Sequence, residues 1–347
     1  MKDFKEIKNA IGDLDTKAME RAKKRLDNLV KPVESLGVME DVVIQLAGIS
    51  GDEYYCTDKK AITIMSSDNG VIAEGIASSP QFVTYAQTIN FTKGLTGVSV
   101  LAKEVGADLF ITDVGINGEL SHPEIRNKKI NMGTKNIAIE DAMTYEEAEK
   151  AINVGIELVN ELSKKGYKIV GLGEMGIGNT TTSSAIISAL TGRNAQETVG
   201  RGAGLSDEAL QKKIKVVNKA IERCTNKDPV AILAQVGGYD IAALVGVCIG
   251  CAYKRIPVVI DGFISIVAAA IAFEVNPKAK NFMISSHLSV EQGYKITADY
   301  IGLEPSINLH LRLGEGSGAA IMFKIIEFSQ AIFKNMGTFE EANIDLG

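Results

Sequence analysis

The chain has 347 residues, of which 46% are hydrophobic and 23% charged, and its formal net charge at pH 7 is −6. This length supports one large or two modest globular domains with a substantial core. The acidic balance excludes a surface that attracts nucleic acid by long-range positive charge, and no run of 18 uncharged apolar residues indicates a membrane span. We therefore expect neither a nucleic-acid nor a membrane partner. Because the first residues form no apolar signal core, we expect a cytoplasmic location.

The predicted elements alternate between helices and short apolar strands. An amphipathic helix over 15–29 comes first, and the longest helix, over 145–164, begins with Thr144 and Glu147 in capping-box spacing. A last long helix covers 320–332. This alternation predicts an α/β fold with a doubly wound, mostly parallel sheet and helices on both faces. The expected buried strands are 61–65, 109–112, 167–170, 257–260 and 282–285.

Polar residues follow each of these strands. In chain order they are Asp68, Asp113, Glu174, Asp261 and His287. Each of them taken singly is also compatible with an ordinary helix cap. Ligands of such sheets bind beyond the carboxyl ends of the strands, so residues that share this edge predict a cleft there.

The segment 168–182 satisfies two nucleotide-binding patterns and fully obeys neither. Gly171, Gly173 and Gly176 form GxGxxG, while Gly173 and Gly178 form GxxxxG followed by Asn179. The first pattern lacks the strand and acidic residue expected about 20 positions on, and the second lacks its lysine. Both predict backbone that passes close to a ligand, with helix amides that bind a phosphate.

Two glutamates stand in glycine-rich surroundings. Glu174 lies within the segment just described, and since a carboxylate repels phosphate, we expect it to face a sugar, a base or a developing cation. Its alternative role is to accept hydrogen bonds from turn amides. Glu315 is flanked by glycines ahead of the last helix, which favours a general base whose pKa is raised by dehydration. Alternatively, Glu315 complements the dipole of that helix.

The cysteines and histidines predict no metal site. Cys248 and Cys251 form a CxxC pattern inside an apolar run, with no second pair nearby, so core packing is favoured over redox chemistry or zinc binding. His122, His287 and His310 lie in separate segments without ligand spacing.

Several blocks together resemble the nicotinate-nucleotide:dimethylbenzimidazole phosphoribosyltransferase family of cobamide biosynthesis. The blocks are GEMGIGNTT at 173–181, VGGYDIAAL at 236–244 and LRLGEGSG at 311–318, and the likeness spans nearly the whole chain. The resemblance implies transfer of 5-phosphoribose from nicotinate mononucleotide to an aromatic base, giving an α-riboside 5′-phosphate and nicotinate. It implies small-molecule substrates, no metal or other cofactor, and a dimer.

The resemblance also assigns roles to residues. Glu315 matches the base and Glu174 a second carboxylate that holds the incoming base or the ribose. Residues 60–310 are expected to form a large nucleotide-binding α/β domain, and 1–59 with 311–347 a smaller, mainly helical domain that completes the active site. The phosphate and ribose are assigned to Gly176, Gly178, Asn179, Thr180, Gly202 and Lys213, and the aromatic base to Ser78, Ser79, Phe82, Tyr85, Ala86, Met175 and Leu313.

The chain departs from the family pattern where the base binds. The family's glutamine falls on Ala86, and Gln87 is one position along, where a helix turns the side chain by about 100°, so we expect that it does not substitute. This departure predicts that the chain belongs to a variant branch that accepts phenol or p-cresol, in which two homologous chains work as a pair. The alternative is a homodimer that uses dimethylbenzimidazole. Two alternatives remain: a catalytically weak partner subunit, and an oxidoreductase supported only by GxGxxG.

Overall fold

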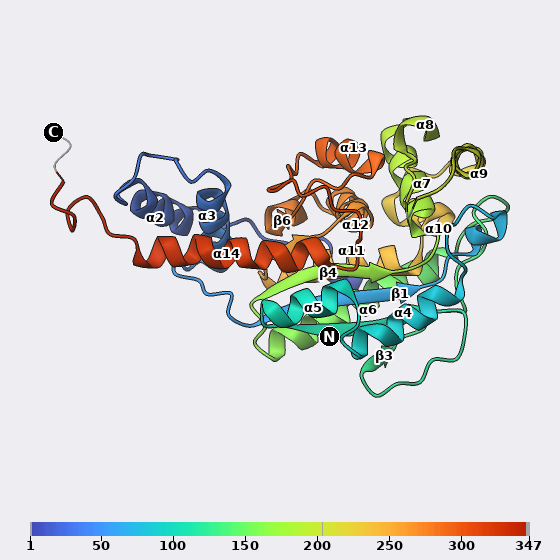
Figure 1. Ribbon diagram of the computed structural model, residues 1–347, viewed down its shortest axis with the longest axis horizontal. Coiled ribbons are helices and arrows are strands. Elements are labelled where there is room, and N and C mark those ends of the chain that lie inside the picture. Colours follow the sequence, from blue (N-terminus) through green and yellow to red (C-terminus); the bar gives the residue numbers. More distant parts are fainter. Residues whose placement is uncertain (1, 203, 345–347) are drawn as a thin grey trace.

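The computed structural model describes residues 2–202 and 204–344, which form a six-stranded sheet surrounded by helices (Figure 1). The strand order is β3-β2-β1-β4-β5-β6, and each neighbouring pair is parallel. The order changes direction between β1 and β4, the switch point beside which such sheets bind ligands. The strands are β1 (Lys60–Ser67), β2 (Ala107–Gly115), β3 (Ile125–Asn127), β4 (Ile169–Met175), β5 (Val258–Ile260) and β6 (Met283–Ser285).

Helices cover both faces of the sheet (Figure 1). Among residues 2–202 and 204–344, no helix combines the length and apolar character that a bilayer crossing requires. The α-helices are α1 (Phe4–Ile7), α2 (Thr16–Asp27), α3 (Val38–Ser50), α4 (Phe82–Thr92), α5 (Gly97–Glu104), α6 (Tyr145–Lys164), α7 (Asn179–Thr191), α8 (Ala195–Thr198), α9 (Asp207–Arg223), α10 (Pro229–Val236), α11 (Tyr239–Lys254), α12 (Phe263–Val275), α13 (Gln292–Ile301) and α14 (Ser317–Asn335), and the 3-10 helices are η1 (Gly70–Glu74) and η2 (Pro277–Phe282).

The alternation of side chains along β1 divides the core into two layers. Ala61 and Met65 belong to the layer that α6 and α11 cover, whereas Ile62 and Ile64 belong to the layer beneath α4, α5 and the first half of α14. Successive strand residues point to opposite faces, so an uninterrupted apolar strand is buried on both. The predicted doubly wound α/β fold is confirmed, including the buried CxxC in α11.

The two chain ends share a third, smaller core. Ala22 of α2, Val43 of α3 and Phe333 near the end of α14 pack together, and Figure 1 shows α14 reaching from the sheet to α2 and α3. Phe4 of α1 instead belongs to the main core, and Phe323 in α14 lies against the sheet. This packing supports a small helical unit, although the boundaries at 59/60 and 310/311 stay a prediction.

Each predicted element overlaps an observed one, although the bounds differ: the strand predicted at 167–170 runs from Ile169 to Met175, and the helix predicted at 320–332 runs from Ser317 to Asn335. Helix α6 covers the predicted residues, and both hydrogen bonds of the Thr144–Glu147 capping box are present. The sequence does not predict strand β3, because its three residues include Arg126 and Asn127 and form no apolar run. It exists because it pairs with β2.

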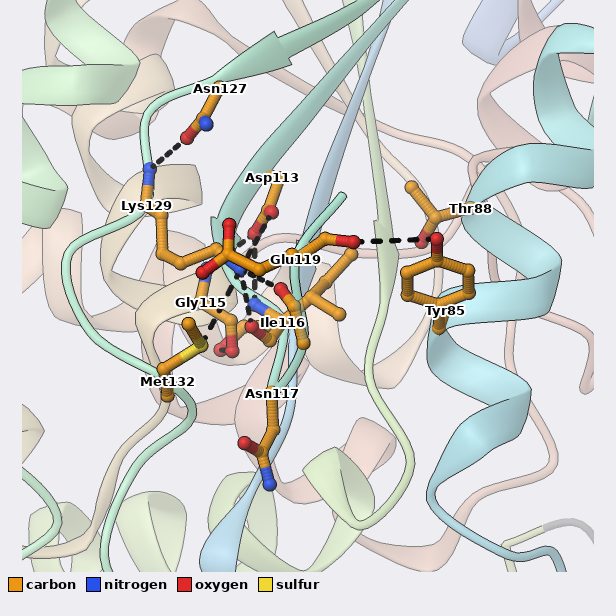
Figure 2. Close-up of polar contacts among 12 residues, drawn as sticks. Tyr85, Thr88, Asp113, Gly115, Ile116, Asn117, Glu119, Asn127, Lys129 and Met132 are labelled. Atoms are coloured by element: carbon orange, nitrogen blue, oxygen red, sulfur yellow. Dashed lines mark hydrogen bonds and ion pairs between the residues drawn. The ribbon is translucent and has the colours of Figure 1, made fainter. Parts of the chain in front are cut away.

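The loop after β2 is held by a buried ion pair, shown in Figure 2. Lys129 Nζ lies 3.3 Å from Asp113 Oδ2 and donates to the carbonyls of Ile116, at 2.7 Å, and Gly118. Asp113 Oδ1 accepts from the amides of Gly115 and Ile116 at 3.0 and 2.9 Å. The prediction that Asp113 faces the cleft is therefore wrong, because its carboxylate is fully engaged in bracing this loop.

Candidate active site

A cavity of about 360 Å³ opens at the carboxyl ends of β1, β4, β5 and β6. Five of the segments that line it stand at strand ends or before α14: 76–79 after β1, 174–181 from the end of β4 into α7, 262–265 after β5, 287–291 after β6, and 312–315 before α14. Residues of α4 and α9, with Arg201, Gly202 and Leu205, complete the lining. The glycine-rich segment and the Glu315 loop thus meet across one cavity beside the switch point. Asp68, predicted to reach the cleft, does not line it and accepts from the amide of Asn117 at 2.8 Å.

Two glycines of β4 bring the carboxylates together. A Cβ on Gly173 would lie 2.6 Å from Ile64 Cδ1 and 2.9 Å from the carbonyl carbon of Glu315, and one on Gly171 would lie 3.0 Å from Ala319 Cβ. Both glycines therefore allow the loop and start of α14 to pack on the strand, and the prediction that they face a ligand is wrong. This packing sets the Glu315 amide 3.5 Å from Glu174 Oε1.

Glu315 has an unusual backbone conformation. Its φ is +63°, and its neighbours Gly314 and Gly316 have φ of +80° and +94°. A left-handed glutamate is unfavourable, so the surrounding structure must impose it. Asp261 does so, because its carboxylate accepts from the amides of Gly316 at 2.9 Å and Gly318 at 2.6 Å, at the N-terminus of α14.

The carboxylate of Glu315 is dehydrated but not isolated. Its residue is only 6% exposed, Oε1 accepts from Gln87 Nε2 at 2.7 Å, and Oε2 has no partner among the described residues. Burial raises the pKa of Glu315, and the hydrogen bond from Gln87 opposes that rise. A buried, partly satisfied carboxylate with a raised pKa suits a general base.

Helix α4 presents Gln87, not Ala86, to this cavity. Val83 and Gln87 line it, since residues four apart share a helix face. Phe82 is 69% exposed, and Tyr85 turns its hydroxyl to the carbonyl of Glu119 at 3.4 Å. Phe82, Tyr85 and Ala86, which the resemblance assigns to the base, therefore do not line this cavity, whereas Gln87, expected not to substitute for the family's glutamine, does line it. Four other residues assigned to the base do line the cavity: Ser78, Ser79, Met175 and Leu313.

Glu174 is bridged to a second buried carboxyl group. Asn179 Nδ2 donates to Glu174 Oε2 and, at 3.0 Å, to Asp240 Oδ2. Burial, followed by the Asp240 charge, raises the pKa of Glu174 to about 8, and burial raises the pKa of Asp240 to about 7. The Asn179 side chain therefore binds carboxyl groups in this structure, and its assignment to phosphate stays a prediction.

The opposite end of the cavity favours an anion. Helix α7 starts after Gly178, whose φ is +96°, and has no side-chain cap. The amides of Asn179 and Thr181 donate to the carbonyls of Gly176 and Gly178, at 3.1 and 2.9 Å, so among the described residues the amide of Thr180 is the one in this turn that a ligand can use. Lys213 Nζ donates to Thr180 Oγ1 at 2.9 Å and lies near Gly202. Burial lowers the pKa of Lys213 to about 8. Sequence reasoning did not predict that three further charged residues line the cavity: Arg201, Glu291 and Arg312.

The comparison with known families decides what this site belongs to. Residues 11–344 match the family model described as "Phosphoribosyltransferase". The chain belongs to this phosphoribosyltransferase family. It is therefore a pentosyltransferase, as the sequence resemblance predicted.

Proteins named nicotinate-nucleotide–dimethylbenzimidazole phosphoribosyltransferase are similar over nearly the full length of this phosphoribosyltransferase. The one from Clostridium perfringens is 51% identical over 342 residues, covering 98% of this chain and 95% of the relative. The one from Acetivibrio thermocellus is 49% identical over 344 residues, covering 99% and 98%. The crystal structure of CobT from Thermus thermophilus superposes with a TM-score of 0.92 at 34% identity, covering 95% of this chain and 100% of that one.

Proposed function

We propose that this phosphoribosyltransferase moves 5-phosphoribose from nicotinate mononucleotide to 5,6-dimethylbenzimidazole, forming an α-riboside 5′-phosphate and nicotinate for cobamide biosynthesis. The names of its relatives support these substrates. The observation that carries the proposal is the cavity itself, in which a buried carboxylate, Glu315, stands across from the anion site around Lys213.

The proposed mechanism divides the cavity between phosphate and base. The phosphate lies on the Thr180 amide at the start of α7 and beside Lys213, which fixes the ribose with its C1′ toward the carboxylates. The C1′–N bond to nicotinate breaks, and its electron pair neutralises the cationic ring nitrogen. A ring nitrogen of the acceptor forms the new bond to C1′, and its N–H proton passes to Glu315. Glu174 faces the positive charge that develops on the ribose.

Gln87 supports a nitrogen heterocycle as acceptor in preference to a phenol. The phenol hypothesis rests on Ala86 in place of a glutamine, whereas the Gln87 amide lies against Glu315 at 2.7 Å. Together these two side chains offer a polar edge to a heteroaromatic ring, and a phenol presents only one hydroxyl. A competition assay with equimolar dimethylbenzimidazole and phenol tests this preference, and a dominant O-riboside product would reverse it.

The test of the function uses the purified single chain. Nicotinate mononucleotide and dimethylbenzimidazole are supplied, and nicotinate and the riboside phosphate are quantified by chromatography. We expect equimolar products. No product from the chain alone, with activity restored by a homologous chain, would favour the weak partner subunit. Hydride transfer to or from a nicotinamide dinucleotide without ribosyl transfer would favour the oxidoreductase.

We also propose that the chain acts as a dimer in the cytoplasm. Exposed apolar side chains near the cavity mouth, among them Phe82, Leu95 and Leu313, support an interface on that side. Light scattering of the pure chain separates a homodimer from a monomer that requires a homologous partner.

A further inference from the structure

Asp240 stands directly behind the active site without lining it. It lies in the first turn of α11, is fully buried, and reaches Glu174 only through the Asn179 amide. The two N–H groups of one amide thus serve two carboxyl groups. Because Asn179 is the first residue of α7, this bridge joins the strand that carries Glu174 to two helices.

The second oxygen of Asp240 has no hydrogen-bond donor. Asp240 Oδ1 and Asn69 Oδ1 are both buried without a partner in the described chain, and a Cβ on Gly238 would meet both atoms. Asn69 Nδ2 donates to the carbonyl of Ile177 at 3.5 Å. Unpaired buried oxygens are unfavourable, and a proton on the carboxyl group would let it donate to an acceptor such as Asn69 Oδ1.

The charged groups around Asp240 are mostly carboxyl groups. They are Glu174 from β4, Asp68 after β1 and Asp261 after β5. Asp261 is paired electrostatically with His287. No lysine or arginine forms an ion pair with Glu174 or Asp240 among the described residues. Two adjacent buried carboxyl groups without a cation share a proton at neutral pH.

The Asn179 amide fixes how the two carboxyl groups lie. Its Nδ2 donates to Glu174 Oε2 and to Asp240 Oδ2, and the other oxygen of Glu174 faces the Glu315 amide at 3.5 Å. On this basis, which rests on the proposed transfer reaction, we propose that Asp240 is a positioning residue: sharing one proton with Glu174, it holds the Asn179 amide that orients Glu174 toward the ribose.

The two substitutions at position 240 are an amide, which can keep the bridge, and a truncated side chain, which cannot. In D240N, the new Oδ1 accepts from Asn179 and the new Nδ2 can donate to Asn69 Oδ1. We expect kcat within about threefold of the native value for D240N. D240A frees the Asn179 side chain and lets Glu174 shift, and displacement on the order of 1 Å lowers kcat by about 100-fold. KM for nicotinate mononucleotide should change much less, since the proposed phosphate site uses Lys213 and the α7 backbone and not the Asn179 side chain.

The pH profile separates positioning from simple support of the fold. The native pair loses its shared proton as pH rises, and kcat falls when both groups are charged. D240N has no such proton, so that alkaline limb should disappear or move to higher pH. The matched control is D113N, the same substitution at a fully buried aspartate near the end of β2 that Lys129 pairs outside the cavity. It should lower the unfolding temperature and leave the pH profile unchanged.

Two results would overturn the inference. One is a D240N enzyme as slow as D240A although both keep native circular dichroism and bind nicotinate mononucleotide, because Asp240 would then act as an anion. The other is native kcat in D240A. Absence of transfer by the unmodified chain would instead reject the proposed function, so the two failures are distinguishable in the same assay.

Discussion

Gln87 Nε2 donates a 2.7 Å hydrogen bond to Glu315 Oε1 and so joins α4 to the loop that precedes α14. The two residues are 228 positions apart, and Gln87 Oε1 in turn accepts from Asn90 Nδ2 within α4 at 3.3 Å. The bond favours the charged form of the glutamate, against the burial that disfavours it. The position of α4 therefore sets how basic this carboxylate is, which leads to the first two predictions.

Replacing Glu315 by Gln should remove the proton acceptor and keep the shape of the site. We expect kcat to fall by about 10² to 10⁴, the range that general bases contribute, with a nearly unchanged KM for nicotinate mononucleotide. Steady-state kinetics at saturating acceptor measure both constants. Turnover within twofold of native would reject Glu315 as the base.

Replacing Gln87 by Leu should shift the pH dependence of turnover. The native hydrogen bond lowers the pKa of Glu315, so its loss raises that pKa further. Because the base acts when ionised, activity falls as pH drops through its pKa, and the acid limb of kcat against pH should move to higher pH in Q87L. An acid limb that moves to lower pH, or stays, would contradict this role.

The sequence is sufficient to predict the fold, the family and the meeting of Glu174 and Glu315 in one cavity. Strands β1 and β4 are buried at every residue, and runs that are mainly apolar, such as 61–65, indicate a sheet buried on both faces. Glu315 stands out because glycines flank it, and its left-handed backbone gives the physical reason. Such signals are local and can be read from neighbouring residues.

The direction in which a side chain points, and the residue with which it pairs, cannot be read from neighbouring residues in the same way. The motif assigns Asn179 to phosphate, but its partner Asp240 is 61 residues away. The strand end assigns Asp113 to the cleft, but Lys129 neutralises it across the loop. The helix face of Gln87 depends on how α4 packs, and no pattern within the helix fixes that packing.

Replacing Lys213 by Met should weaken binding of the donor. Its ammonium is buried beside Thr180, and hydrogen bonds to charged groups contribute about 1.5–3 kcal/mol, so KM for nicotinate mononucleotide should rise at least about tenfold. The pKa of Lys213 is lowered to about 8, so the unfolded chain binds this proton more tightly. Native stability should therefore rise between pH 8 and the ordinary lysine pKa of about 10.4.

The K213M variant should lack that rise, and phosphate should stabilise it less than the native chain. Thermal unfolding with and without phosphate over this pH range measures both effects. Equal stabilisation of the two proteins by phosphate would place the anion elsewhere.

Replacing Lys129 by Met should destabilise the loop after β2, which the ion pair of Lys129 with Asp113 holds (Figure 2). It would leave the buried Asp113 charge unpaired and release the Ile116 and Gly118 carbonyls. Breaking one partner of a buried ion pair costs about 3–5 kcal/mol. Lys128 is a matched control, since its pair with Glu157 is exposed and K128M should cost at most about 1 kcal/mol. Urea unfolding measures the free energy of unfolding of both variants. Equal losses would show that the Lys129–Asp113 pair stabilises the protein no more than an exposed ion pair does.

Replacing Gly173 by Ala tests the packing that brings Glu315 to Glu174. The added Cβ would lie 2.6 Å from Ile64 Cδ1 and 2.9 Å from the Glu315 carbonyl carbon, so the loop must move away from β4. Overpacking of this kind costs about 1–3 kcal/mol, and displacement of Glu315 should lower kcat as well. The control is G12A, where the nearest atom, Arg255 Nη1, lies 3.7 Å from the added Cβ. Unfolding and turnover should be near native in G12A and both impaired in G173A, whereas native turnover in G173A would mean that close contact with β4 does not position the base.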